Sequence, residues 1–263
     1  MRAIALSSTV LMLTSLASSS VFAQERGFRL PPHAQKIEDD AYYLGKTKDK
    51  GGKEVEGIAF LHPKERAAKG GGKPPGGSTS TCFSLMSSGA RWKTIEPYVV
   101  DPSTSDPIGA SDIPLLIAGC LSSWETASGR PIFGNEAEEV VNRSSIGQLN
   151  NVNEFMFGAI DDPGVIAVTI VWGRFSGPAQ FRELVEWDMI FDEIDFTFDD
   201  ATTDSSAMDF LNIFQHESGH AAGLSHPANT CINETMYAYA TEGETKKRDL
   251  AAGDIAGIRA LYR

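Results

Sequence analysis

The chain of 263 residues has little cysteine and little histidine, with three of the former and five of the latter. An odd number of cysteines leaves one thiol unpaired when the other two form a disulfide. Beyond residue 23 no apolar run is long enough to span a bilayer, so we expect no membrane anchor. Positive charge is also scarce, with 23 Lys and Arg against 35 Asp and Glu and a net charge of −12. Such a chain repels nucleic acid and anionic membranes, which excludes both as expected partners.

Residues 1–23 are typical of a secretory signal peptide. Arg2 precedes an apolar run, and small residues lead to Ala23. An uncleaved signal anchor is the alternative, but the apolar run is short for that role. We therefore expect a secreted protein, extracellular or periplasmic and monomeric, with one domain and an accessory segment.

Residues 24–80 are the candidate accessory segment. They carry 11 Lys and Arg against 8 Asp and Glu, whereas residues 81–263 carry 11 against 27. Residues 41–44 and 55–61 are strand-like and flank a Gly-rich turn, which predicts a hairpin that must lie on something larger. Residues 69–77 are rich in Gly and Pro and cannot hold regular structure. They mark a domain boundary and an exposed site for proteolysis.

Residues 81–263 show a strand, a helix, more strands and then a second helix. The expected elements are strands over 92–100, 155–160, 165–172 and 185–191, a helix over 111–126, and a helix that begins near residue 205. Over 185–191 every second residue is large and hydrophobic, and the residues between them are Glu186, Asp188 and Ile190, as in a half-buried strand.

The second helix carries the residues with the clearest chemistry. His216 and His220 are four residues apart, so both lie on one face of a helix and can ligate the same zinc ion. Glu217 beside them can act as a general base. Gly223 permits a left-handed turn that ends the helix and brings His226 back as a third ligand. Three protein ligands leave a position for water, which is the arrangement of a catalytic zinc site.

This stretch resembles the metzincin metallopeptidases. Residues 234–237 resemble the Met-turn of that clan, and residues 250–262 are similar to the closing helix of matrixins. The Met-Tyr pair points to matrixins, since Ala238 stands where astacins and serralysins usually place a tyrosine. Pro227 is more like serralysins, and the proline usual after Met-Tyr is missing. Specific motifs cover residues 214–262.

The resemblance implies a mixed α/β (α+β) catalytic domain over residues 81–263. It has a twisted sheet of about five strands and three main helices, with the zinc site at the end of the second helix. Met236 would have a structural role under the metal, or it is a plain core residue. Tyr237 and Tyr239 border a pocket beyond the metal, or they only pack. The catalytic region has no histidines left for a second zinc, so we expect one zinc ion.

The function implied is that of a secreted zinc metalloendopeptidase, a hydrolase acting on protein or peptide substrates. Zinc lowers the pKa of its bound water and polarises the scissile carbonyl, and Glu217 moves the proton to the leaving amine. One alternative is a secreted binding module that keeps the zinc fold without catalysis, although Glu217 is retained. Another is a serralysin-like peptidase.

Two further features allow a functional and a plain interpretation. Residues 165–172 are an edge strand that pairs with substrate, as in matrixins, or a core strand. Five acidic residues before the second helix are candidates for calcium binding, although their spacing is not that of an EF-hand and they equally serve solubility. These residues are Asp192, Asp195, Asp199, Asp200 and Asp204.

The cysteines predict one disulfide, between Cys82 and Cys231. A secreted chain passes through an oxidising compartment, and Cys120 lies on the apolar stripe of its helix, where a free thiol behaves as a small hydrophobe. The bridge would tie the loop before the Met-turn to the start of the catalytic domain.

Residues 24–77 are expected to act as a propeptide that keeps the enzyme latent as a zymogen. They are net positive ahead of a strongly negative domain, which favours docking. The Pro-Arg-Cys-Gly setting that matrixins use for latency is absent. His33 or an acidic residue of the run 38–40 could occupy the open zinc position instead. The alternative is a folding aid or a surface hairpin that never touches the metal.

Overall fold

The computed structural model describes residues 27–38, 40–65 and 78–263. The expected signal peptide and the Gly-rich cleavage site lie outside these ranges. The main sheet has seven strands, which in spatial order are β1 (Gln35–Glu38), β2 (Ala41–Lys48), β3 (Glu54–Pro63), β7 (Val165–Arg174), β8 (Glu183–Asp192), β6 (Asn153–Gly158) and β5 (Tyr98–Asp101). The helices are α1 (Ile113–Ser128), α2 (Phe210–Ala221) and α3 (Ala252–Tyr262). The expected mixed α/β fold with three main helices is confirmed.

The remaining elements are short. Strands β9 (Phe198–Asp199) and β10 (Met208–Asp209) form one small sheet, and β4 (Ser84–Leu85) and β11 (Leu224–Ser225) form another. Two 3-10 turns, η1 (Ala179–Phe181) and η2 (Lys246–Arg248), complete the set.

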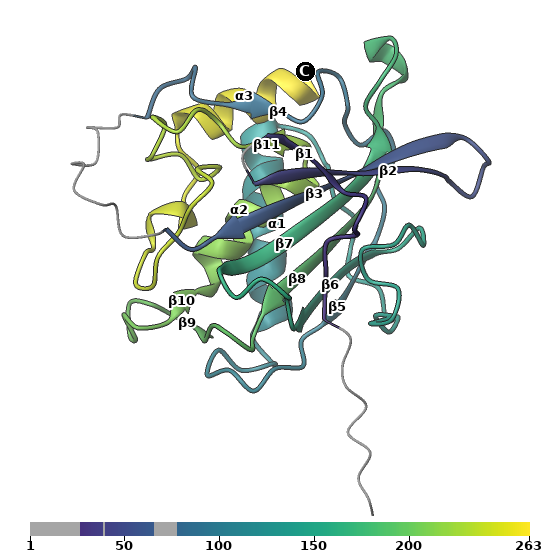
Figure 1. The fold of residues 1–263 in the computed structure, drawn as a ribbon. Coiled ribbons are helices and arrows are strands. Elements are labelled where there is room, and N and C mark those ends of the chain that lie inside the picture. The colour runs from purple at the N-terminus through teal and green to yellow at the C-terminus, as the bar shows by residue number, and fades with distance from the viewer. Residues whose placement is uncertain (1–26, 39, 66–77) are drawn as a thin grey trace, which may run out of the picture.

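The sheet is mixed in direction. Strands β5, β6 and β8 run parallel, β7 is antiparallel to β8, and β3 is antiparallel to β7. Helices α1 and α2 lie against one face, and α3 lies close to one end of the sheet (Figure 1). Six phenylalanines join this face to α2, with ring centroids 5.1–6.1 Å apart. They are Phe155, Phe157, Phe191, Phe198, Phe210 and Phe214. This aromatic cluster fixes the height of α2 over the sheet.

The N-terminal hairpin is a continuation of the sheet, which has seven strands instead of about five for this reason. Strand β3 pairs with β7 from Glu56 opposite Gly173 to Pro63 opposite Val165. Strand β7 is therefore not an edge strand in this form of the chain, and its first nine residues are all buried. The hairpin was expected to rest on a larger body, and the open edge of β7 supplies it.

Strand β8 departs from the half-buried pattern that its sequence predicts. Glu186 and Asp188 are fully buried, because the loop before β6 folds over them. The backbone N–H groups of Asn150 and Gly147 donate to these two carboxylates, over 3.0 and 2.7 Å. Burial of both faces follows from this loop, whose position the strand pattern cannot reveal.

Two element boundaries differ from expectation. Helix α2 begins at Phe210 and not near residue 205, because Asp209 caps it by accepting from the N–H of Asn212 over 2.8 Å. The first strand of the catalytic region is shorter than residues 92–100. Trp92 lies outside it and donates its indole N–H to the carbonyl of Ala221 at the end of α2.

Candidate active site

Helix α2 places His216 and His220 one turn apart on one buried face. The helix ends at Ala221, and Gly223 follows two residues later with a φ of +105°, in the region that favours glycine. An added Cβ there would also come within 2.8 Å of Leu261 and 3.0 Å of a backbone oxygen. The predicted turn at Gly223 is thus present, and it brings His226 back to the helix.

The three Nε2 atoms converge on one point. His220 Nε2 lies 3.2 Å from that of His216 and 3.1 Å from that of His226, and the third separation is 3.3 Å. Nitrogens bound tetrahedrally to zinc at about 2.0–2.1 Å stand roughly 3.3–3.4 Å from one another. The spacing therefore fits one zinc ion with three imidazole ligands.

The other ring nitrogens of two histidines are fixed by backbone carbonyls. Nδ1 of His216 donates to the oxygen of Thr235 over 2.7 Å, and Nδ1 of His220 donates to that of Leu224 over 2.9 Å. Because a carbonyl only accepts, the proton of each neutral ring is on Nδ1. The lone pair of each Nε2 is then available to a metal. Burial lowers the pKa of both histidines well below the usual value, which keeps them in the neutral form that binds metal.

Glu217 is fully buried beside the histidines. One carboxylate oxygen accepts from the hydroxyl of Thr169 on β7 over 2.5 Å, and the other lies 2.8 Å from Nδ1 of His62 on β3. Burial raises the pKa of Glu217 to about 8, and the smaller effects of Thr169 and the charge of Lys247 oppose it. A carboxyl with such a pKa can hold and release a proton near neutral pH.

The Met-turn, residues 234–237, is clamped by α3. Asp254 accepts from the N–H groups of Thr235 and Met236 over 2.8 and 3.1 Å. Met236 is fully buried against α2, where its sulfur would lie 2.2 Å from a Cβ added at Gly219. The turn also supplies the carbonyl that holds His216. These contacts make the turn a rigid support for the first histidine.

Residues 151–263 match the family model of the matrixins, peptidase family M10. This part of the chain is a matrixin-like metzincin catalytic domain. The matched range contains the three histidines, Glu217 and the Met-turn, and the matrixin family implies zinc. The match favours a matrixin over the serralysin-like alternative. A search of curated proteins found no match.

Two of the three cysteines are paired as the sequence predicts. Cys82 and Cys231 form a disulfide, and Cys120 is a buried free thiol. Burial raises the pKa of Cys120 to about 12, so this thiol is inert. The bridge lies next to Gly253 of α3, since a Cβ added there would meet the carbonyl oxygen of Cys82 at 2.1 Å.

Strand β3 covers the histidines of the matrixin-like domain. Phe60 stacks on His220 with ring centroids 4.2 Å apart and an interplanar angle of 11°. The ring of His62 lies 3.9 Å from that of His216, and its Nε2 lies 2.9 Å from Nζ of Lys247. The sequence interpretation missed His62 and Lys247. One signal was available for His62, which follows Phe60 by two residues and therefore faces the same side of the strand.

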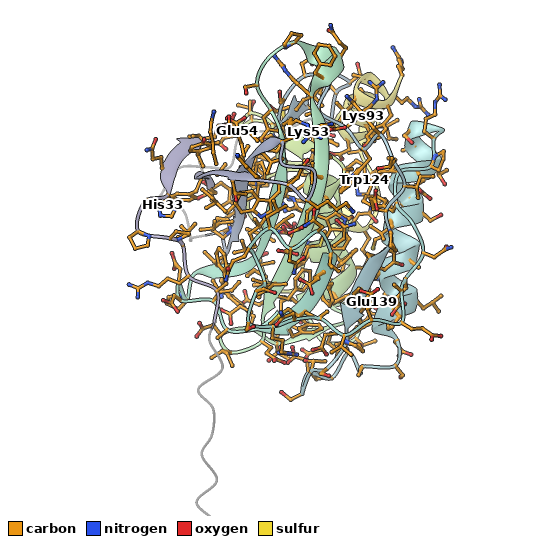
Figure 2. The ribbon with its side chains drawn as sticks, turned by 90° about the vertical axis from the view of Figure 1, so that its right-hand side faces the viewer. His33, Lys53, Glu54, Lys93, Trp124 and Glu139 are labelled. Carbon is orange, nitrogen blue, oxygen red and sulfur yellow. A yellow bond between two sulfur atoms is a disulfide. The ribbon has the colours of Figure 1, made fainter. Side chains whose placement is uncertain are left out.

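Of the residues expected at the open zinc position, His33 and Glu38 make other contacts, and Asp39 lies outside the described residues. His33 binds the carbonyl of Leu44 over 2.9 Å and lies on the outer side of the hairpin, across the molecule from Trp124 of α1 (Figure 2). Glu38 accepts from the hydroxyl of Ser225 over 2.9 Å, near the third histidine but not on it. His62 of β3 instead contacts Glu217 and Lys247.

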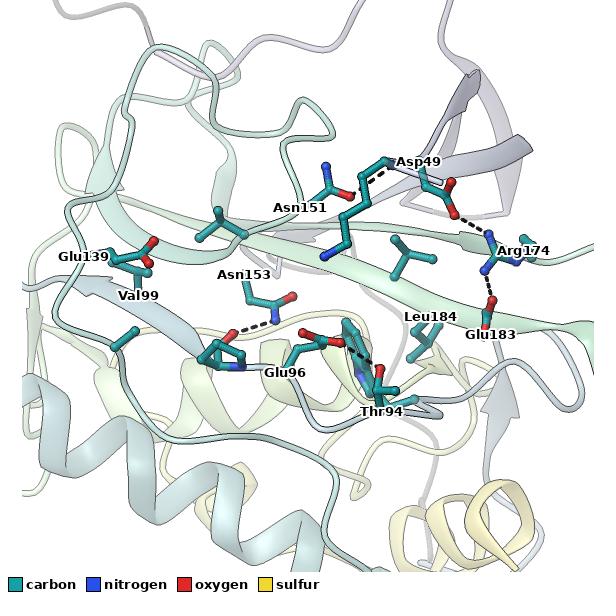
Figure 3. A pocket seen from close by; sticks show the side chains of 16 residues that line it. Asp49, Thr94, Glu96, Val99, Glu139, Asn151, Asn153, Arg174, Glu183 and Leu184 are labelled. Carbon is teal, nitrogen blue, oxygen red and sulfur yellow. Dashed lines mark hydrogen bonds and ion pairs between the residues drawn. The ribbon is translucent and has the colours of Figure 1, made fainter. Parts of the chain in front are cut away.

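Two hollows lie at opposite ends of the β2–β3 hairpin. One of about 490 Å³ is bordered by Pro63, Tyr237 and Tyr239, so both tyrosines lie where the strand ends. The other, of about 370 Å³, lies at the far end of β7, where Arg174 stands between Asp49 of the hairpin turn and Glu183 (Figure 3). No histidine lines the second hollow, and its ion pairs anchor the hairpin turn to the matrixin-like domain.

Within the described ranges, only two groups of three or more metal-binding side chains bring their ligand atoms together. They are the three histidines, and His62 with His216 and Glu217. The aspartates before α2 are not such a group: Asp200 pairs with Arg248, and Asp204 accepts from Ser206. Calcium binding there stays a prediction. No helix in the described part of the chain is long and apolar enough to cross a membrane.

Proposed function

We propose that the chain is a secreted zinc-dependent endopeptidase in which His216, His220 and His226 hold one zinc ion and Glu217 is the general base. The observation that carries this proposal is the convergence of three Nε2 atoms within 3.1–3.3 Å of one another, with Glu217 beside them on the same helix. The expected signal peptide, the disulfide and the matrixin match support secretion. The expected substrates are proteins and peptides, and the protein is expected to act as a monomer.

A bound zinc ion supplies a Lewis acid that polarises the scissile carbonyl. The residues of the chain do the rest. Once His62 has left, the freed oxygen of Glu217 accepts the proton of the attacking water and passes it to the leaving nitrogen. Thr169 holds the other oxygen in place, over 2.5 Å. Thr235 and Leu224 fix the ring orientation of two ligands through their carbonyls.

The chain described here is the latent form in this proposal. A substrate binds as an extended strand on the free edge of β7 by strand addition. Strand β3 takes that edge, Phe60 covers the histidines, and His62 occupies one oxygen of Glu217. Residues 24–80 therefore act as a propeptide that blocks the groove in a substrate-like manner. If chain cut between Lys69 and Lys73 and uncut chain cleave a peptide equally fast, latency is excluded.

The function is tested by metal content and by Glu217→Ala. Purified chain should contain one zinc ion, and cut chain should cleave a peptide library unless a chelator is present. Glu217→Ala should keep the zinc and lose at least about 10²-fold in turnover, the scale of one general base. Glu139→Ala, which removes an exposed carboxylate, is the control and should keep full activity. A zinc-free wild type, or full activity in Glu217→Ala, contradicts the proposal, and zinc binding without cleavage supports the binding-module alternative.

A further inference from the structure

The side chain of His62 fills a closed space next to Glu217. It is fully buried, with Nδ1 2.8 Å from an oxygen of Glu217 and Nε2 2.9 Å from Nζ of Lys247. An ammonium group only donates, so Nε2 accepts from Lys247 and Nδ1 donates to Glu217. The inner end of the space is therefore a fixed hydrogen-bond donor.

A substrate would place a side chain in the same space. Strand β3 lies on the edge of β7 to which an extended peptide adds, and His62 stands opposite Ala167. Side chains alternate between the two faces of a strand, so Phe60 and His62 both point toward α2. A peptide that replaces β3 in this register sends one side chain into the space that His62 leaves.

Lys247 is held in place independently of β3. Its backbone N–H donates to Oδ1 of Asn212 on α2 over 2.7 Å, and its Nζ donates to the carbonyl of Tyr237 over 2.6 Å. The side chain is fully buried. Without His62, the carbonyl of Tyr237 is the remaining hydrogen-bond acceptor of Nζ among the described residues.

An unfilled donor on a buried cation is costly, and an apolar side chain in this space expels water without replacing its hydrogen bond. We propose that Lys247 is a specificity-determining residue, and that the peptidase selects substrates with Gln or Glu at the position of His62 over substrates with an apolar side chain there. Both side chains end in an acceptor at about the reach of the His62 ring, and neither carries the imidazole N–H that occupies Glu217 in the latent form. The inference rests on the proposed function, since it assumes that the groove takes a substrate.

The first test measures specificity in zinc-loaded chain cut between Lys69 and Lys73. A library digest identifies a cleaved peptide and the position at which Gln or Glu is enriched, and versions with Gln or Met at that position are compared. Both residues are neutral and similar in length, so the acidic surface does not bias the pair. The Gln peptide should have a kcat/KM about 10-fold or more above that of the Met peptide, the scale of one hydrogen bond to a charged group.

Lys247→Met should remove or reverse this preference, and Lys246→Met is the matched control. Lys246 is exposed, and its Nζ pairs with Glu244 over 3.2 Å, so its loss should leave the preference unchanged. The inference is overturned if the wild type cleaves the Met peptide as fast as the Gln peptide. It is also overturned if Lys247→Met and Lys246→Met change the preference equally. Neither result bears on whether the chain is a peptidase.

The second test needs no activity and uses the intact chain. His62→Gln keeps an acceptor for Lys247, whereas His62→Met does not, so Met should lower the unfolding midpoint more than Gln. In a Lys247→Met background this order should reverse, because the donor is gone. The same order in both backgrounds overturns the inference. This comparison decides the chemistry of the space even if the cut chain proves inactive, which would refute the proposed function instead.

Discussion

Two glycines in the zinc-binding stretch are required for different physical reasons. Gly223 adopts a φ of +105°, which other residues rarely reach. Gly219 lies inside α2, where glycine is intrinsically unfavourable, and its place is explained by space. A Cβ there would lie 2.2 Å from the sulfur of Met236 and 2.7 Å from the ring of Trp124. The helix that carries His216 and His220 can approach the Met-turn this closely only with glycine at 219.

Gly219→Ala should therefore destabilise the fold although alanine favours helices. Overpacking of this kind costs about 1–3 kcal/mol. The control is Gly119→Ala in α1, where nothing lies within 4 Å of the added Cβ and alanine should stabilise by about 0.5–1 kcal/mol. Urea unfolding of both variants measures the difference. Equal effects in the two helices would show that Met236 and Trp124 yield without cost.

A second residue-scale prediction concerns Glu186 and pH. Burial raises its pKa to about 7, and Glu154 adds to this while the N–H groups of Asn150 and Asn151 oppose it. The unfolded value is about 4.3, so the stabilising contribution is complete below that pH and is lost as pH rises toward about 7. The loss is on the order of 3 kcal/mol.

Unfolding free energies measured from pH 4 to 8 test this. Glu186→Gln should flatten the decline but not abolish it, because burial also raises the pKa of Asp188 well above its usual value. Glu139→Gln, at an exposed position, should follow the wild type. A wild type that gains stability over this pH range contradicts the assignment.

At the residue scale, the sequence predicted what depends on local spacing. The three histidines, Glu217 and the turn at Gly223 lie within eleven residues, so helix geometry and this one turn bring them together. Lys247 and His62 meet across a sequence separation of 185 residues. Nothing in the local pattern of either residue encodes that contact, which arises only when β3 pairs with β7.

At the element scale, the Met-turn depends on one side chain of α3. Both carboxylate oxygens of Asp254 accept backbone N–H groups, those of Thr235 and Ala251 over 2.8 Å and that of Met236 over 3.1 Å. The carbonyl of Thr235 then orients His216. The closing helix therefore positions a zinc ligand through two consecutive hydrogen bonds.

Asp254→Asn should weaken zinc binding without touching a ligand. The variant replaces one acceptor oxygen by a donor that faces backbone N–H groups, which loosens the turn under His216. Loss of such support typically lowers metal affinity about 10–100-fold. Competition with a chelator measures it, and Asp249→Asn at an exposed position is the control. Unchanged affinity in Asp254→Asn would mean that α3 does not position the ligand.

The positions of helices and strands along the chain were easier to predict than the elements that pack against them. The hairpin strands, α1 and three strands of the main sheet were expected close to their observed positions, because hydrophobic periodicity reports which face is buried. Periodicity does not report the partner. The outer edge of β7 is covered by β3, which fits the core-strand alternative. The acidic face of β8 is covered by the loop before β6, so β8 is more buried than its pattern predicts. The start of α2 was misplaced because Asp209 was not recognised as its cap.

At the scale of the whole molecule, the seven-stranded sheet joins two segments of opposite net charge. Each segment supplies a cation to one ion pair between them and an anion to another. Lys64 of the first segment pairs with Glu242 of the second, whereas Asp49 of the first pairs with Arg174 of the second over 2.8 Å. General attraction between a positive segment and a negative domain is therefore not what fixes the hairpin. Strand pairing and the packing of Phe60 and His62 hold it.

The last prediction follows from this mode of attachment. While the chain is intact, β3 is tethered at an effective concentration in the millimolar range, so the groove is closed at any protein concentration. A cut between Lys69 and Lys73 leaves the strand pairing intact and makes it bimolecular. The activity of cut chain per mole should therefore rise on dilution, whereas that of uncut chain should stay low and constant. Peptide cleavage measured over a 1,000-fold dilution series, about the span of three decades in affinity, checks this.

Two additions sharpen the experiment. A synthetic peptide of residues 27–65 added to diluted cut chain should suppress activity again, and the same peptide with Phe60→Ala and His62→Ala should do so more weakly. Asp49→Asn on the peptide tests the anchor at the hairpin turn, which lies away from the histidines. Activity of cut chain that is independent of dilution and insensitive to the peptide would show that β3 does not compete for the groove. Cut chain that stays inactive at every dilution would instead mean that the strand is a permanent part of the sheet and that Glu217 stays blocked.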